Sequence, residues 1–93
     1  MERLDDDVIA AGLEGLRWER QGDMLVRVIE RGNFGEAMEL VNGVAQLAEG
    51  ANHHPDIHIS WNKVTLELST HSAGGITQND LDLAAAIDGL SPG

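Results

Sequence analysis

The most regular hydrophobic pattern lies in the middle of the chain, between positions 33 and 50. Asn33 is a suitable N-cap, and Glu36 follows three residues later as in a capping box. Gly50 could end the helix in a left-handed conformation. The apolar residues of this segment recur at the three- and four-residue spacing of one helical face; they are Phe34, Ala37, Met38, Val41, Val44, Ala45 and Ala48.

From position 57 onward the apolar residues alternate with polar ones. Ile57, Ile59 and Trp61 form the apolar set of one run, and a second run alternates from Lys63 to His71. A period of two is typical of β-strands because successive side chains point to opposite faces. This part of the chain therefore predicts two strands, the second ending at His71, followed by a loop at "SAGG".

The remaining segments predict two more helices and a hairpin. Residues 6–16 should form a helix, since acidic residues stand at its start where the helix dipole favours them. Residues 17–30 indicate two strands joined by "QGD", and the nearly continuous apolar run "MLVRVI" predicts a strand shielded on much of both faces. A last helix is expected from Thr77, with Asp80 as its capping carboxylate.

The element order is thus α-β-β-α-β-β-α. Hairpin connections imply an α+β fold, with a four-stranded antiparallel sheet and three helices packed on one face. The chain of 93 residues has the length of one domain, which we place at residues 1–93.

Composition narrows the classes of function. The chain has no cysteine, so neither a disulfide nor a thiolate metal site can form. Its 16 acidic and 6 basic residues give a formal charge of −10, which opposes direct binding to a nucleic acid. No run approaches the roughly 20 apolar residues of a membrane span, and no signal peptide is recognisable, so we expect a cytoplasmic protein without membrane attachment.

The histidines are concentrated in "EGANHHPDIHISW", which contains three of the four in the chain. His54 and His58 have a spacing that would join two metal ligands on a helix. On a strand, however, four residues cover about 13 Å, which is too far for one ion. His53 and His54 should point apart as neighbours in extended chain, and no nearby cysteine or carboxylate completes a zinc set. We therefore expect no metal site.

Acid/base chemistry is a second interpretation of these histidines. An imidazole titrates near neutral pH and can both donate and accept a proton. His71 ends a strand that neighbours the "HHP" segment through a hairpin-like connection, so it can approach His53 or His54. Two imidazoles on either side of a small substrate would suit proton removal at one atom and proton delivery at another. Loop histidines that only bond to the backbone remain the alternative.

Other polar and aromatic residues have simple structural interpretations. Glu49 is expected to be a solvated residue at the end of a helix, and His58 should be exposed on the polar side of its strand. Trp61 is expected in the core or in a pocket wall. A role for Asp80 in a site is the less favoured interpretation beside helix capping.

The spaced polar positions resemble those of the pterin-4a-carbinolamine dehydratases. The residues that carry the resemblance are Glu49, the "HHP" of His53–Pro55, Trp61, His71 and Asp80. The strings "WNKVTLELSTHSAGGIT" and "DLDLAAAID" are also similar to that family. The resemblance covers about residues 8–90 and is most specific in the C-terminal half.

This resemblance implies a fold of the same architecture and a hydro-lyase activity. Members of the family dehydrate 4a-hydroxytetrahydrobiopterin to quinonoid dihydropterin, which regenerates the cofactor of aromatic amino acid hydroxylases. They use neither a metal nor an organic cofactor. They associate as homodimers or homotetramers through a sheet edge and helix packing.

The resemblance also implies roles for individual residues. His53 and His71 would be the acid/base pair, and His54 would mainly bind and orient the pterin. Ser72 stands where many relatives carry an acidic residue. The substrate contacts implied are Asn52, His53, His54, Ser69, Thr70, His71 and Ser72, and the motif adds Trp61, Glu49 and Asp80 to the site.

Two functional alternatives remain beside that enzyme. The same fold serves as a non-catalytic interaction module, either as a transcriptional coactivator or as an assembly chaperone for a carbon-fixing enzyme. The natural substrate could also be another reduced pterin or a folate. In either case we expect at least a homodimer, because "MLVRVI", taken as an outer strand, has only Arg27 to protect its edge.

Overall fold

A computed structural model of the protein describes residues 2–90 and confirms the predicted element order. Within the described residues, the structure adds a short 3₁₀ helix before the last α-helix. The elements are α1 (Asp6–Leu13), β1 (Glu19–Gln21), β2 (Met24–Glu30), α2 (Phe34–Ala51), β3 (Asp56–Ser60), β4 (Lys63–Leu68), η1 (His71–Ala73) and α3 (Gln78–Leu90).

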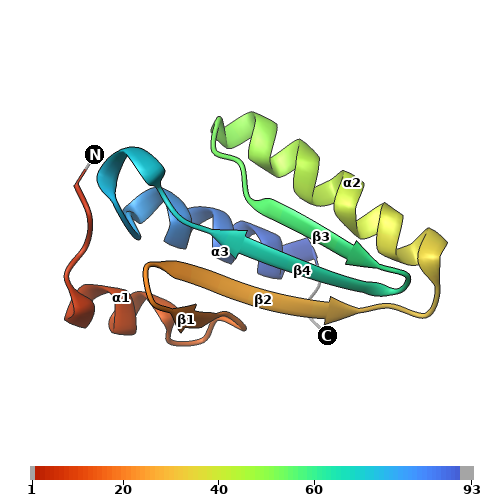
Figure 1. Ribbon diagram of the computed structural model, residues 1–93, viewed down its shortest axis with the longest axis horizontal. Helices are drawn as coiled ribbons and strands as arrows, with labels where there is room; N and C mark the ends of the chain where they lie inside the picture. The colour runs from red at the N-terminus through yellow and green to blue at the C-terminus, as the bar shows by residue number, and fades with distance from the viewer. Residues whose placement is uncertain (1, 91–93) are drawn as a thin grey trace.

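The four strands form one antiparallel sheet in the order β1-β2-β4-β3 (Figure 1). Ile29 pairs with Val64 between the two inner strands, and Ile57 pairs with Leu66 at the β3 edge. β1 and β3 are therefore the edge strands. The α-helices cover one face of this sheet, as the apolar pattern predicted, and the other face is open.

The core lies between that face and the helices. Leu25 and Ile29 of β2 face it together with the alternating apolar residues of β4, all of them at most 4% exposed. The two inner strands thus turn every second side chain toward the helices, as a sheet covered on one side requires. The helices contribute the other wall of the core, chiefly through Ile9, Ala37, Leu40, Val44, Ala48, Leu81, Leu83, Ala84 and Ile87.

A buried ion pair connects the sheet to the last turn of α3. A guanidinium nitrogen of Arg27 lies 2.5 Å from Asp88 Oδ1, and both side chains are largely shielded from solvent. Trp18 Nε1 donates to the same oxygen at 2.9 Å, while the Arg17 N–H donates to Oδ2 at 2.8 Å. These donors compensate for the burial of the carboxylate. The polar residue that interrupts "MLVRVI" therefore faces the core and does not protect an edge.

The structure corrects the prediction for "MLVRVI" in two respects. This segment is β2, which lies between β1 and β4, so it is not an outer strand. Its second face is also only partly covered, because Val26 is 8% exposed but Val28 is 55% exposed. Helices pack on only one side of the sheet, and this leaves Val28 open to solvent.

Several predicted boundaries were also wrong. α1 stops at Leu13 instead of continuing to position 16, and Gly15 then takes a left-handed φ of 79°. β4 ends at Leu68, before His71, because the chain turns at Thr70 and pairs it with Gly75 in an isolated bridge. His71 consequently begins the 3₁₀ turn η1.

Trp61 lies neither in a strand nor in the core. It occupies the turn between β3 and β4 with a left-handed φ of 51°, and it is 62% exposed. Its neighbour Asn62 fixes this turn, since its side-chain N–H donates to the Arg31 carbonyl at 2.8 Å. The alternation of apolar residues therefore ends one position earlier than the sequence pattern predicts.

The N-terminus of α2 offers a test of the local stability of the fold. The Asn33 side chain accepts a hydrogen bond from the Glu36 N–H at 2.8 Å, as predicted. Replacing Asn33 by Ala should lower the free energy of unfolding by about 1 kcal/mol, the usual cost of losing an N-cap. Urea denaturation measures this change. Asn42→Ala, on the exposed surface of the same helix, is the matched control and should not destabilise the protein; equal losses in both variants would contradict the capping role.

Candidate functional site

Four chain segments meet at one end of the molecule, on the left of Figure 1: the end of α2, the start of β3, the turn η1 and the start of α3. His53 Nε2 lies 2.5 Å from Asp80 Oδ1. The Thr70 hydroxyl lies 2.9 Å from Asp80 Oδ2. Asp80 therefore connects the histidine after α2 to the segment that carries His71.

The end of α2 sets the position of the first two histidines. The helix runs on through Gly50 to Ala51, and the left-handed residue is Asn52, with a φ of 51°. Asparagine tolerates this conformation because its short polar side chain can bond locally. The His53 N–H then donates to the Ala48 carbonyl at 3.1 Å, which closes the helix end. The chain reverses at this point and enters β3 with His53 beside the start of α3.

Asp80 is the only carboxylate among residues 2–90 that is completely buried. Its Oδ2 accepts from the Thr77 N–H and from the Thr70 hydroxyl, each at 2.9 Å. An ionised carboxylate can only accept hydrogen bonds, so His53 must donate through Nε2–H to Oδ1. The neutral ring of His53 is therefore held in one tautomer, with the lone pair on Nδ1. The predicted helix cap is confirmed, but the same carboxylate also orients a histidine.

The two threonines complete this network. Since the Thr70 hydroxyl donates to Asp80, Thr77 must donate its own hydroxyl hydrogen to Thr70 Oγ1, at 2.8 Å. The Thr70 backbone bonds to Gly75 at 2.8 Å and so closes the η1 turn. His71 follows Thr70 directly and is exposed at the surface. Thr77 was not among the predicted site residues, although its position three residues before Asp80 could have indicated it.

His54 and His58 have different surroundings from His53. His54 Nε2 lies 2.5 Å from Glu49 Oε2, and both side chains are more than half exposed. Glu49 was expected to be solvated, and it is exposed, but it also pairs with a histidine. His58 lies 3.3 Å from Glu67 on the open face of the sheet and takes no part in the Asp80 network.

The structure brings most of the predicted site residues together. Asn52, His53 and His54 form the turn after α2, and Ser69, Thr70, His71 and Ser72 form the segment between β4 and α3. Trp61 is the exception. It follows the last residue of β3, and the five residues of that strand span about 16 Å. Trp61 therefore lies away from His53, His54 and His71.

Within residues 2–90, no group of three or more His, Asp or Glu side chains is arranged to hold a metal ion. The imidazoles at this end of the molecule are those of His53, His54 and His71. No helix in the same part of the chain is long and apolar enough to cross a membrane.

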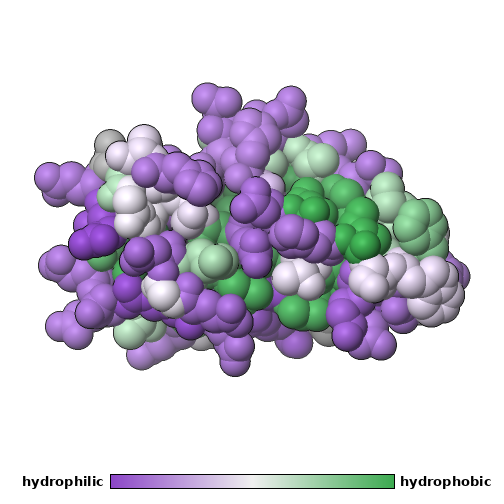
Figure 2. All heavy atoms as spheres, viewed as in Figure 1, coloured by the Kyte–Doolittle hydropathy of each residue, from purple (hydrophilic) through white to green (hydrophobic). Residues whose placement is uncertain are grey.

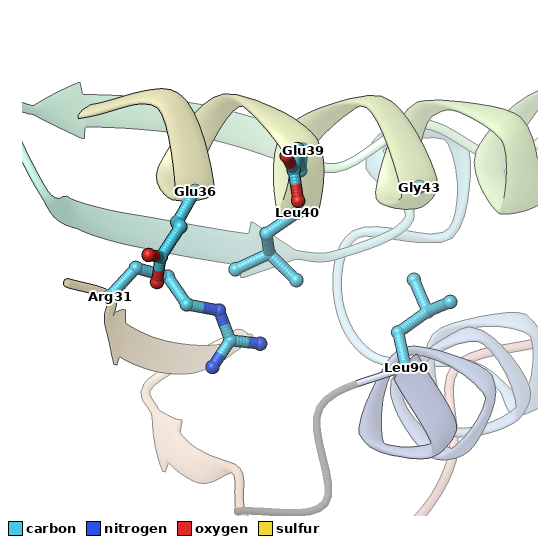
Figure 3. A pocket seen from close by; sticks show the side chains of 6 residues that line it. All are labelled: Arg31, Glu36, Glu39, Leu40, Gly43 and Leu90. Atoms are coloured by element: carbon cyan, nitrogen blue, oxygen red, sulfur yellow. The ribbon is translucent and has the colours of Figure 1, made fainter. Parts of the chain in front are cut away.

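Two cavities lie along the line where α2 packs against α3. A cavity of about 180 Å³ borders His53. A larger hollow of about 610 Å³ lies at the other end of these helices, where Leu40 and Leu90 face it together with Arg31, Glu36 and Glu39 (Figure 3). The larger hollow has no histidine in its wall, so it is separate from the site described above.

Comparison with known proteins gives a consistent result. The family model described as "Pterin 4 alpha carbinolamine dehydratase" matches residues 2–90. A protein of Thermomicrobium roseum named "Putative pterin-4-alpha-carbinolamine dehydratase" is 55% identical over 92 residues, covering 98% of this chain and 99% of that protein. A protein of the same name from Nocardia farcinica is 50% identical over 91 residues, covering 97% and 96% of the two chains.

Solved structures support the same fold. A protein of Brucella melitensis described as a transcriptional coactivator/pterin dehydratase superimposes with a TM-score of 0.91 at 26% identity, over 97% of this chain and 99% of the other. A pterin dehydratase-like protein identified as a RuBisCO assembly factor in the alpha-carboxysome has a TM-score of 0.65 at 22% identity, over 82% and 88% of the chains, and shows similarity of fold alone. The chain belongs to the pterin-4-alpha-carbinolamine dehydratase family.

Proposed function

We propose that the protein is a hydro-lyase that dehydrates 4a-hydroxytetrahydrobiopterin, or a closely related pterin carbinolamine, to the quinonoid dihydropterin in tetrahydrobiopterin recycling. The observation that supports this most directly is the pairing of His53 with the fully buried Asp80, 2.5 Å away. A buried carboxylate that fixes the tautomer of an imidazole prepares that imidazole for proton transfer.

The proposed reaction needs one acid and one base. The C4a–O bond breaks, and the leaving oxygen takes a proton from the acid and departs as water. The lone pair of N5 forms the new double bond to C4a, and the base removes the proton from N5. Water afterwards returns the proton to the acid and takes it from the base, so no co-reactant is consumed.

The Asp80 network assigns these two roles within the proposal. His53 donates Nε2–H to Asp80, so its Nδ1 carries the lone pair that a base needs. Asp80 then stabilises the imidazolium that forms when Nδ1 takes the proton. His71 is the remaining candidate for the acid, and its exposed ring can regain a proton from solvent.

The other residues of this end would bind the pterin ring. Pterins carry several hydrogen-bond donors and acceptors on a flat bicyclic ring. His54, held by Glu49, and the polar side chains of Asn52, Ser69 and Ser72 offer partners for them. A non-catalytic interaction role, as named for the coactivator and assembly-factor structures, remains the alternative and predicts that these side chains can be replaced without loss of function.

Removing either proposed acid/base residue should abolish most of the activity. His53→Ala and His71→Ala should each lower kcat by about 10²-fold or more, the usual contribution of a positioned acid or base. His54→Ala should mainly raise KM, because its role is binding. Steady-state kinetics on the three variants measures these effects, with His58→Ala as a control outside the Asp80 network. Near-normal kcat for both His53→Ala and His71→Ala would refute the assignment.

Asp80 should act as a positioning residue. Asp80→Asn can offer Oδ1 or an N–H to the ring and no longer specifies one tautomer, so kcat should fall by about tenfold or more while KM changes little. Nitrogen-15 chemical shifts should show Nε2–H alone for His53 in the unaltered protein and a mixture of tautomers in the variant. If Asp80→Asn is folded and has a low kcat, but His53 keeps the Nε2–H tautomer, then Asp80 does not act through His53.

We also expect the protein to form at least a homodimer. The strand that would pair with a second chain is the edge strand β3, because β2 lies inside the sheet. This edge strand runs from Asp56 to Ser60 without a proline or lysine, and Ile59 and Trp61 beside it are exposed. Figure 2 shows hydrophobic surface on the face where β3 and α2 lie. Pairing β3 with its symmetry mate would satisfy the free edge and cover these side chains.

Sedimentation velocity at micromolar concentration tests this expectation. The charge of −10 per chain opposes association, so the dimer should tighten as added salt screens the repulsion. Ile59→Lys should shift the protein toward monomer, while Val28→Lys, on the open face of an inner strand, should not. A monomer of about 10 kDa in both low and moderate salt would contradict β3 pairing.

A further inference from the structure

Among the described residues of one chain, no tryptophan, tyrosine or phenylalanine lies beside the histidines of the proposed site. The sequence has three such residues, Trp18, Phe34 and Trp61. Trp18 is buried and donates to Asp88, near the far end of α3 from Asp80. Phe34 begins α2, whose 18 residues separate it from these histidines by about 27 Å. Pockets for flat rings are lined largely by hydrophobic and aromatic side chains, so the site of a single chain lacks one component.

Trp61 has two properties that its place in the fold does not explain. It is 62% exposed, more than any other large hydrophobic residue that the structure describes. It also has a left-handed φ of 51° in its hairpin turn, a conformation in which a bulky side chain is strained. In the turn between β1 and β2, Gly22 takes the corresponding conformation without that strain. A strained and exposed aromatic residue is a candidate for a functional contact.

Pairing of β3 with its symmetry mate would bring Trp61 to a second site. The strand has five residues, Asp56–Ser60, and His58 is the middle one. A two-fold axis at His58 pairs all five residues with the antiparallel strand of the other chain. Trp61 follows His58 by three residues, and Pro55 precedes it by three. The partner's Trp61 would therefore stand opposite Pro55, with the two Cα atoms about 5 Å apart.

This position adjoins the histidines of the site. Pro55 directly follows His54, and His53 is two residues away, which is about 7 Å of extended chain. An indole that projects from a position opposite Pro55 can reach across this distance. Ile57, the next residue but one after Pro55, packs against the core on the helix side of the sheet, and His53 meets Asp80 of α3 on that same side. Each tryptophan is thus remote from the histidines of its own chain and close to those of the other.

We propose that two subunits build each site, and that the partner subunit's Trp61 supplies an aromatic face for the pterin ring beside His53 and His54. This inference rests on the proposed dehydratase function and on the pairing of β3. It accounts for the exposure and the strain of Trp61 in a single chain. A monomer would contain the acid/base residues but only part of the surface that binds the ring.

The first measurement removes the aromatic face and keeps an apolar side chain. Trp61→Leu should raise KM for 4a-hydroxytetrahydrobiopterin by about tenfold, the scale of one lost stacking contact, and should change kcat little. Trp61→Phe keeps a smaller aromatic face and should lose less. Both variants are assayed at concentrations where sedimentation velocity shows dimers, which separates loss of stacking from loss of the interface. A KM for Trp61→Leu within about twofold of the wild-type value would overturn the proposal.

Heterodimers that carry the same two substitutions in different arrangements identify the subunit that supplies the tryptophan. Co-expression with two affinity tags allows each heterodimer to be purified. In the first, one subunit carries His53→Ala and the other Trp61→Leu. The site that keeps His53 then receives the unaltered Trp61 of the partner subunit, so KM should equal the wild-type value, with about half the kcat per dimer.

In the second heterodimer, one subunit carries both substitutions and the other carries none. The site that keeps His53 then lacks the partner's Trp61, so KM should rise by about tenfold. A raised KM in the first heterodimer with a normal KM in the second would show that Trp61 serves the site of its own chain. The same KM in both would show that it serves neither site. Either result would overturn the proposal.

Binding provides a comparison that is independent of turnover. Calorimetric titration with 7,8-dihydrobiopterin should find one site of wild-type affinity in the first heterodimer and none in the second. If this pattern holds but the wild-type protein catalyses no dehydration, the shared site is supported and the proposed reaction is refuted. If the wild-type protein catalyses dehydration but the pattern is reversed or absent, the reaction stands and the shared site is refuted.

Discussion

The proposed chemistry depends on one buried carboxylate. Asp80 has no contact with solvent, and its three hydrogen bonds come from the chain segments before β3, after β4 and at the start of α3. Each partner compensates for part of the cost of burying the charge, so loss of any one would leave the others poorly matched. The carboxylate thus caps α3, joins the segments that carry His53 and His71, and fixes the tautomer of His53.

The sequence predicted the elements well because their periodicity is local. The α2 stripe, the Asn33 cap and the alternation along β4 each follow from side-chain spacing within one segment. Sheet order was not predictable in this way. "MLVRVI" is apolar enough for an edge that pairs with a second chain, but the apolar pattern cannot show that β4 crosses over to lie beside β2. The position of Trp61 was missed because a residue in a hairpin turn can continue the alternation without belonging to the strand.

The candidate site was predicted in part. The resemblance placed His53, His71 and Asp80 at matching positions, and the fold brings the segments that carry them together. Reasoning from spacing alone treated Asp80 as a cap and left the histidines undecided between catalysis and simple surface roles. The interaction between His53 and Asp80 joins residues 27 positions apart, and only the tertiary structure shows it. Thr77 was overlooked although it lies only three residues before Asp80, because its hydroxyl bonds to Thr70 and not directly to a histidine.

Family membership alone does not decide between catalysis and a binding role, because similar folds are described both as a pterin dehydratase and as an assembly factor. The most direct measurement is the rate at which chemically generated 4a-hydroxytetrahydropterin loses water, followed by stopped-flow absorbance with and without the wild-type protein. The account predicts that catalytic amounts of protein accelerate this dehydration well above the spontaneous rate. A rate equal to the spontaneous one, with folded protein present in excess over the substrate, would contradict it.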